Sequence, residues 1–85
     1  MDKETIEQIF GDILFNRINV TRSEYTEGTN LADDLGADSL DVIEIVMSVE
    51  DAFDFEILDT EIPGLRTVKD YINLISEKLS SKGTA

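Results

Sequence analysis

Hydrophobic residues recur at helical spacing near the start of the chain. Five of them lie three or four positions apart and form one stripe: Ile6, Ile9, Phe10, Ile13 and Leu14. This period predicts an amphipathic helix, and Asp2, followed by acidic residues in the first turn, is the candidate N-cap. Gly11 lies off the stripe and costs about 1 kcal/mol relative to alanine in a helix interior, which packing of the stripe can offset.

Two further helices carry the same kind of start signal. Asp38 caps a helix that begins beside Ser39 and runs to about Phe53, and Asp41 follows three residues later, as in an acidic capping box. The segment "TVKDYINLISEKL" repeats this arrangement with Thr67 and Asp70. Its buried stripe is predicted to contain Val68, Tyr71, Ile72, Ile75 and Leu79.

The two connections between these helices differ in length. Residues 19–37 show no sustained period and form a long connection, with Val20, Leu31 and Leu35 as its anchors in the core. A loop this long in a small domain is usually functional. Pro63 and Gly64 oppose an extended helix in the second connection and permit at most one short turn. The pattern predicts an all-α small bundle of three long helices and a short fourth, with a long first loop.

The chain has 85 residues, which suits a single domain over 1–85 with one core and no deep cleft. We expect order over about 3–80 and a flexible tail over 80–85. The start "MDKETIEQ" lacks the blocks of a secretory signal, and the longest apolar run, "IVM", is far too short to span a bilayer. We therefore expect a cytoplasmic protein that does not insert into membranes.

The charge distribution is strongly acidic. The net charge is -12, and thirteen acidic residues but no Lys or Arg lie between Ser23 and Leu65. Such a chain repels nucleic acid and anionic membranes, so the expected partners are basic proteins or cations. A solvated, self-repelling face is the simpler alternative.

The helix after Ser39 has more apolar positions than one buried stripe needs. The better core stripe contains Val42, Ile45, Val46, Val49 and Phe53. A second stripe is formed by Leu40, Ile43 and Met47, and the carboxylates around it are Asp38, Asp41, Glu44, Glu50 and Asp51. The second stripe is either additional core or an exposed docking surface, and the sequence pattern leaves both open.

Ser39 lies at a predicted helix start in a chain without histidine or cysteine. A serine nucleophile needs an adjacent general base, no imidazole is present, and no Lys lies between Lys3 and Lys69. Catalysis by this chain alone is therefore not expected, and no metal site is predicted. A serine at a helix N-terminus is nevertheless exposed, and the helix dipole would stabilise a phosphate esterified to it. A plain first-turn residue is the alternative.

The segment "DLGADSLD" at 34–41, followed by "VIEIVMSVEDAFDFEI" at 42–57, closely resembles the acyl carrier proteins of fatty acid synthesis. The resemblance extends from about Ile6 to Leu79 and implies a four-helix bundle. It implies that Ser39, in the motif Asp38-Ser39-Leu40, carries phosphopantetheine taken from coenzyme A, and that the thiol of this arm carries acyl chains as thioesters. A phosphopantetheinyl transferase attaches the arm in this family, so Ser39 needs no base of its own.

The resemblance also implies the partners and the interior. The helix after the serine meets basic patches on ketoacyl synthases, reductases, dehydratases and acyltransferases, while the carrier itself acts as a monomer. The expected contact residues are Asp38, Leu40, Asp41, Ile43, Glu44, Met47, Glu50 and Asp51. The expected lining of an acyl pocket is Ile13, Ile45, Val49, Phe53, Ile57, Val68 and Ile75.

One region departs from the family pattern. Leu58 stands where the family usually has proline, and "IPG" at 62–64 interrupts the short helix. This departure keeps open a specialised carrier for polyketide or nonribosomal peptide assembly. An unmodified acidic interaction module or cation binder is the least favoured alternative, because the chain lacks the spaced Asp loop of a calcium site.

Overall fold

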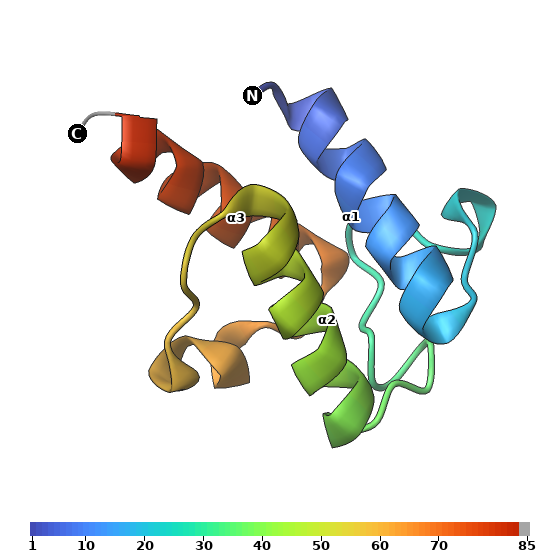
Figure 1. Ribbon diagram of the computed structural model, residues 1–85. Coiled ribbons are helices and arrows are strands. Elements are labelled where there is room, and N and C mark those ends of the chain that lie inside the picture. The colour runs from blue at the N-terminus through green and yellow to red at the C-terminus, as the bar shows by residue number, and fades with distance from the viewer. Residues whose placement is uncertain (84–85) are drawn as a thin grey trace.

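The computed structural model describes residues 1–83 and contains three long helices, shown in Figure 1. Helix α1 spans Lys3–Ile18, α2 spans Ser39–Phe53 and α3 spans Val68–Gly83. Two 3₁₀ helices lie in the connections, η1 over Arg22–Glu24 and η2 over Asp59–Gly64. The predicted all-α class, with three long helices, a short one and a long first loop, is confirmed.

Each long helix begins with the cap that the sequence predicts. The Asp2 carboxylate accepts the N–H three residues later at 2.8 Å. At α2, the Asp41 N–H donates to Asp38 Oδ1 at 2.9 Å, and the Asp38 N–H donates to Asp41 Oδ2 at 3.2 Å. Thr67 and Asp70 exchange the equivalent pair of bonds before α3, at 3.0 and 3.2 Å. These local bonds satisfy N–H groups that have no partner within the helix, and so fix where each helix starts.

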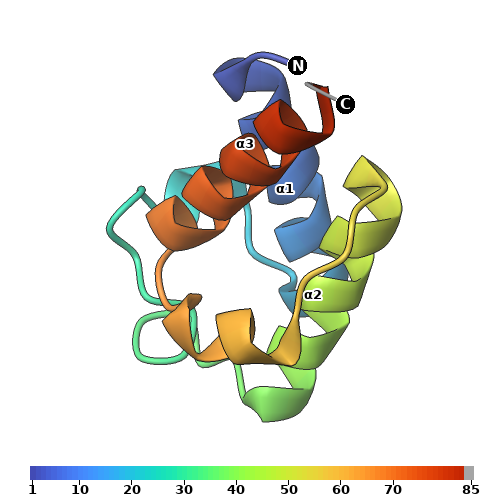
Figure 2. The ribbon, with the colours of Figure 1, turned by 90° about the vertical axis from the view of Figure 1, so that its left-hand side faces the viewer.

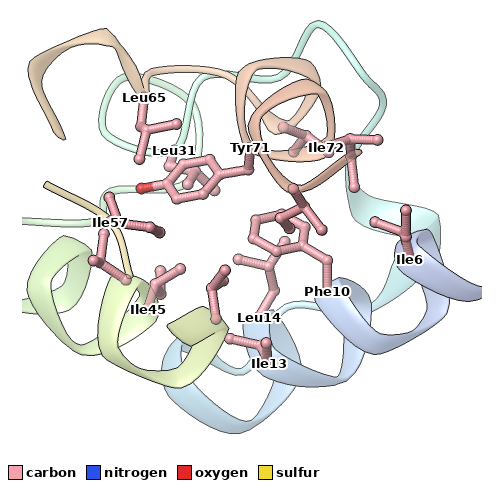
Figure 3. Close-up of a cluster of buried hydrophobic side chains, with 14 of the residues drawn as sticks. Ile6, Phe10, Ile13, Leu14, Leu31, Ile45, Ile57, Leu65, Tyr71 and Ile72 are labelled. Atoms are coloured by element: carbon pink, nitrogen blue, oxygen red, sulfur yellow. The ribbon is translucent and has the colours of Figure 1, made fainter. Parts of the chain in front are cut away.

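The core forms where α1 packs against both α2 and α3 (Figure 3). α2 runs in the direction opposite to α1, as Figure 1 shows. The Phe10 and Tyr71 rings stack across the core with centroids 5.0 Å apart. Predicted anchors Val20 and Leu31 are buried, and Leu35 is half-buried against the core. The first loop is thus held by apolar side chains at three points.

Gly11 has a tertiary role that the helical pattern could not reveal. A Cβ atom at this position would come within 2.9 Å of the Tyr25 hydroxyl, which the first loop brings against α1. Because real Cβ atoms essentially never show such a short contact, glycine is the residue that allows this approach. The stability that Gly11 costs α1 is therefore the consequence of letting Tyr25 of the first loop pack against the helix.

The first loop is also bonded to the start of α3. The Leu31 N–H donates to the Arg66 carbonyl at 3.0 Å, and the Val68 N–H donates to the Thr29 carbonyl at 3.0 Å. Asn30 organises the turn between them, since its Oδ1 accepts the N–H groups of the second and third residues that follow, both at 2.9 Å. Both ribbon views place this loop beside the beginning of α3 (Figure 2). The loop before Ser39 is consequently attached to the rest of the fold.

The region around Pro63 is more helical than expected. The prediction of at most one short turn was wrong, because η2 comprises six residues and includes Pro63. Proline removes only one N–H donor, and its fixed φ suits a 3₁₀ helix, so the bonds from Glu61 N–H to the Leu58 carbonyl and from Leu65 N–H to the Ile62 carbonyl still form.

Near the C-terminus, α3 reaches Gly83 and so includes much of the tail predicted to be flexible. Residues 84–85 of that tail lie outside the described residues.

Candidate functional site around Ser39

Ser39 is the first residue of α2, and its side chain is exposed. The helix begins at its lower end in the view of Figure 1. The chain reaches it through Gly36, which has a φ of +73°, and Ala37, which is buried. The Ala37 N–H donates to the Leu31 carbonyl at 2.9 Å. One residue before the cap is therefore fixed in the core, and the serine two positions later is held at the surface.

The hydroxyl of Ser39 is accessible but has no general base of its own. The chain contains no histidine, and the neighbouring carboxylates of Asp38 and Asp41 are engaged as reciprocal caps. The first-turn N–H groups and the helix dipole provide a positive end that stabilises an anion by about 0.3–1 kcal/mol. The arrangement suits a hydroxyl that receives a phosphate ester from an outside catalyst. No group of three or more potential metal ligands lies together among residues 1–83.

The second apolar stripe of α2 faces solvent. Leu40 is 64 % exposed, Ile43 43 % and Met47 58 %, whereas the core stripe from Ile45 to Phe53 is buried. The alternative that all three are core is wrong, because α1 and the loops cover only one side of α2. We call Leu40, Ile43 and Met47 the α2 strip. It begins one residue after Ser39 and continues for two turns along the helix.

Two of the five carboxylates expected around the α2 strip have partners outside the Asp38–Asp41 capping box. Glu44 Oε2 lies 3.9 Å from Arg17 Nη1, and Arg17 Nε donates to Ser48 Oγ at 2.9 Å. Glu50 Oε2 accepts the Ile57 N–H at 2.9 Å and is half-buried. Arg17 comes from α1, so its place beside the acidic edge of the α2 strip was not evident from sequence. Glu50 contributes to the turn after α2, while Asp38 and Asp51 are exposed and Asp41 is half-buried.

The seven residues expected to line an acyl pocket all lie in one buried cluster. Their exposed fractions are 8 % or less, and they come from all three long helices and from the segment after α2. Figure 3 shows part of this cluster between the helices. The interior is thus aliphatic and aromatic, which is the chemistry that a hydrocarbon chain would meet.

Sequence analysis missed a pocket that the first turn of α2 helps to form. It has a volume of about 300 Å³, and its walls include Leu31, Val42 and Leu65. These residues belong to the first loop, α2 and the segment between η2 and α3, so no local pattern could indicate that they meet. Asn30, which organises the loop turn, also lines this pocket and was likewise missed.

Comparison with known proteins first assigns the class. The family model described as "Phosphopantetheine attachment site" matches residues 4–75, which include nearly all of α1, all of α2 and the first half of α3. The fold and the exposed serine at the start of α2 thus belong to a domain that carries phosphopantetheine covalently. Among residues 1–83 there is no helix of the length and hydrophobicity needed to cross a membrane.

Two curated relatives narrow the class. An acyl carrier protein from Syntrophobacter fumaroxidans is 43 % identical over 77 residues, covering 91 % of this chain and 95 % of the relative. An acyl carrier protein from Coprothermobacter proteolyticus is 37 % identical over 82 residues, covering 96 % of this chain and all of the relative. The chain belongs to the acyl carrier protein family, whose members are carriers and not catalysts.

Proposed function

We propose that Ser39 is the residue that bears phosphopantetheine, and that the loaded protein delivers acyl chains to the enzymes of fatty acid synthesis in the cytoplasm. The observation that carries the proposal is the exposed hydroxyl of Ser39 at the first position of α2. When bound, the arm supplies a thiol for thioester formation, which a chain without cysteine cannot provide. Ser39 supplies the ester oxygen, and the start of α2 stabilises the phosphate.

The α2 strip and its acidic edge are proposed as the surface that partner enzymes recognise. A strip of three exposed apolar side chains next to the attachment residue can dock into a partner, while carboxylates attract basic patches. Such attraction speeds encounter more than it tightens the complex, which suits a carrier that must leave each enzyme. The proposed contact residues are Asp38, Leu40, Asp41, Ile43, Glu44, Met47 and Asp51. Glu50 joins them only through the oxygen that is not engaged with Ile57.

The buried cluster is proposed as the shelter for the acyl chain. Its seven expected lining residues are all apolar, so a saturated chain that enters between them exchanges water for hydrocarbon, which is favourable. The chain would have to displace packed side chains, because interiors of proteins are closely packed. The cluster therefore serves as ordinary core in the unloaded protein and as a lining in the loaded one.

Attachment is tested by mass. The purified protein is incubated with coenzyme A and a broad-range phosphopantetheinyl transferase, and its intact mass should rise by one phosphopantetheine. Ser39→Ala should stay unmodified, while Ser23→Ala, which removes another exposed serine, should react as the wild type does. An unmodified wild type, or a Ser39→Ala variant that still gains the mass, would show that the assignment is wrong.

The pathway is tested by the cargo. Protein isolated from its native host should carry unbranched acyl chains and their oxidised intermediates on the arm, as read from intact mass and fragmentation. Aminoacyl groups or branched polyketide chains in their place would assign the protein to another assembly pathway.

A further inference from the structure

Tyr71 places a hydroxyl group inside the hydrophobic core. The residue has 0 % exposure, and its ring stacks on Phe10. Its hydroxyl is buried and has no hydrogen-bond partner among the described residues. Figure 3 shows the hydroxyl end of the ring directed away from Phe10, toward the region of Leu31, Leu65 and Ile57. The labelled side chains toward which this polar atom is directed are therefore all aliphatic.

A buried hydroxyl without a partner is unfavourable for folding, since it has lost its bonds to water. Phenylalanine would fill the same space without that cost. Burial raises the pKa of the Tyr71 phenol to about 12, with a smaller contribution from the nearby charge of Asp70. The hydroxyl therefore remains protonated at neutral pH and can donate a hydrogen bond to an oxygen atom that reaches it.

The position of this hydroxyl relates it to Ser39. Leu31 and Leu65, toward which the hydroxyl end is directed in Figure 3, also line the 300 Å³ pocket at the first turn of α2. Val42, another wall of that pocket, is three residues after Ser39, which corresponds to a rise of about 4.5 Å along the helix. The phosphopantetheine arm lies between Ser39 and the thioester, so an acyl chain whose thioester rests at the mouth of this pocket would meet the Tyr71 hydroxyl close to its thioester end, after passing the two leucines.

We propose that the Tyr71 hydroxyl is a hydrogen-bond donor for an oxygen near the thioester end of the acyl cargo, so that the protein holds β-oxoacyl and β-hydroxyacyl chains in preference to saturated chains of equal length. This inference rests on the proposed function, because it requires a chain tethered at Ser39. It adds a specificity-determining residue to an interior that is otherwise apolar. The bond gives the Tyr71 hydroxyl a partner, and it also satisfies an oxygen of the acyl cargo that would otherwise be buried without a hydrogen bond.

The test compares two cargoes in two proteins. Wild type and Tyr71→Phe are each loaded on the arm with a β-oxoacyl chain and with a saturated chain of the same length, and intact mass verifies loading. Urea unfolding then gives the folding equilibrium constant of each form. The ratio of the constant for the β-oxoacyl form to that for the saturated form should be about two- to twelve-fold greater in wild type than in Tyr71→Phe, the range expected of one hydrogen bond.

Tyr25→Phe is the matched control. The Tyr25 hydroxyl is also buried and without a partner among the described residues, but it lies against Gly11 of α1. This variant should keep the wild-type cargo ratio. In wild type, the ¹³Cζ resonance of Tyr71 should also move when the saturated cargo is replaced by the β-oxoacyl cargo, while that of Tyr25 stays in place.

The outcomes separate the two levels of the argument. A wild-type protein that gains no arm overturns the proposed function. A protein that loads both cargoes, yet shows the same ratio in wild type and Tyr71→Phe or an equal loss in Tyr25→Phe, overturns only the role of Tyr71. Without cargo, Tyr71→Phe should fold at least as stably as wild type. A tenfold weaker folding constant there would reveal a partner for the hydroxyl in the free protein and would also overturn the proposal.

Discussion

The side chain of Glu50 provides a sharp test of how α2 ends. Its Oε2 atom accepts the Ile57 N–H at 2.9 Å, across the turn that follows α2. The turn passes through Asp54, which has a φ of 58°. Because the bond joins the last turn of the helix to a residue whose side chain is buried, removing the carboxylate should loosen the path into η2.

The size of the effect follows from two opposing contributions. A hydrogen bond to a charged group contributes about 1.5–3 kcal/mol, and the lower end applies because Glu50 is only half-buried and water can replace part of the bond. Alanine recovers about 0.5 kcal/mol or less through its higher helix propensity. We therefore expect Glu50→Ala to lower the free energy of unfolding by about 1 kcal/mol, which in a domain of this size lowers Tm by about 4–8 °C.

Asp51→Ala is the control for this measurement. It removes the same charge from the next position of α2, and Asp51 is exposed. Relief of repulsion in a chain of net charge -12 affects both variants, so their difference in urea or thermal unfolding, followed by circular dichroism, isolates the hydrogen bond. Glu50→Gln keeps an acceptor oxygen and should lose less than Glu50→Ala. Equal stability of Glu50→Ala and Asp51→Ala would refute a structural role for this carboxylate.

Three further changes test other parts of the molecule. Glu44→Lys should slow acyl transfer by partner enzymes at low salt while leaving the helix content intact, because it reverses a charge beside the α2 strip. Glu77→Lys, on the exposed surface of α3, is the control. Equal transfer rates for wild type and both variants would show that this edge is not part of the interface. Gly11→Ala should not give the stabilisation of about 1 kcal/mol that helix propensity predicts, because its Cβ would lie 2.9 Å from the Tyr25 hydroxyl. Thermal unfolding should show the stabilisation by Gly11→Ala only when the protein also carries Tyr25→Phe. A stabilisation by Gly11→Ala in the wild-type background would show that the contact with the Tyr25 hydroxyl does not oppose the substitution. The backbone N–H of Thr67, the cap residue of α3, donates to Asp70 and holds the pKa of this carboxyl below its ordinary value of 3.8. The ionised carboxylate therefore stabilises the fold above pH 3.8, and this stabilisation is lost as the pH falls through the folded pKa. Urea titrations should therefore show a stability deficit of Asp70→Asn at neutral pH that shrinks in acid, and a deficit independent of pH would exclude an ionic contribution.

Local features of this fold were predictable because their partners are close in sequence. The caps at Asp38 and Thr67 involve residues three positions apart, and the stripes of α1 and α3 repeat over one element. The same locality gave Ser39 its place at the start of α2. The local prediction around Pro63 was wrong, because the missing N–H of proline excludes a long α-helix but is tolerated in a short 3₁₀ helix.

Features that join distant segments could not be predicted in this way. Arg17 and Ser48 meet because α1 packs on α2, and Gly11 accommodates a tyrosine from the first loop. The pocket lined by Leu31, Val42 and Leu65 likewise combines three segments. A periodicity argument sees only one helix at a time, so it identifies which residues are apolar without identifying what they contact.

The amino-acid sequence by itself determined the three long helices, their caps, the acidic character and the position of the Asp38-Ser39-Leu40 motif, because propensity, capping and charge act over a few residues. Only the tertiary structure decided which of the two apolar stripes of α2 faces water, and that Tyr71 carries its hydroxyl into the core. The physical reason is that burial belongs to the packed assembly: a side chain is covered only when another element lies on it.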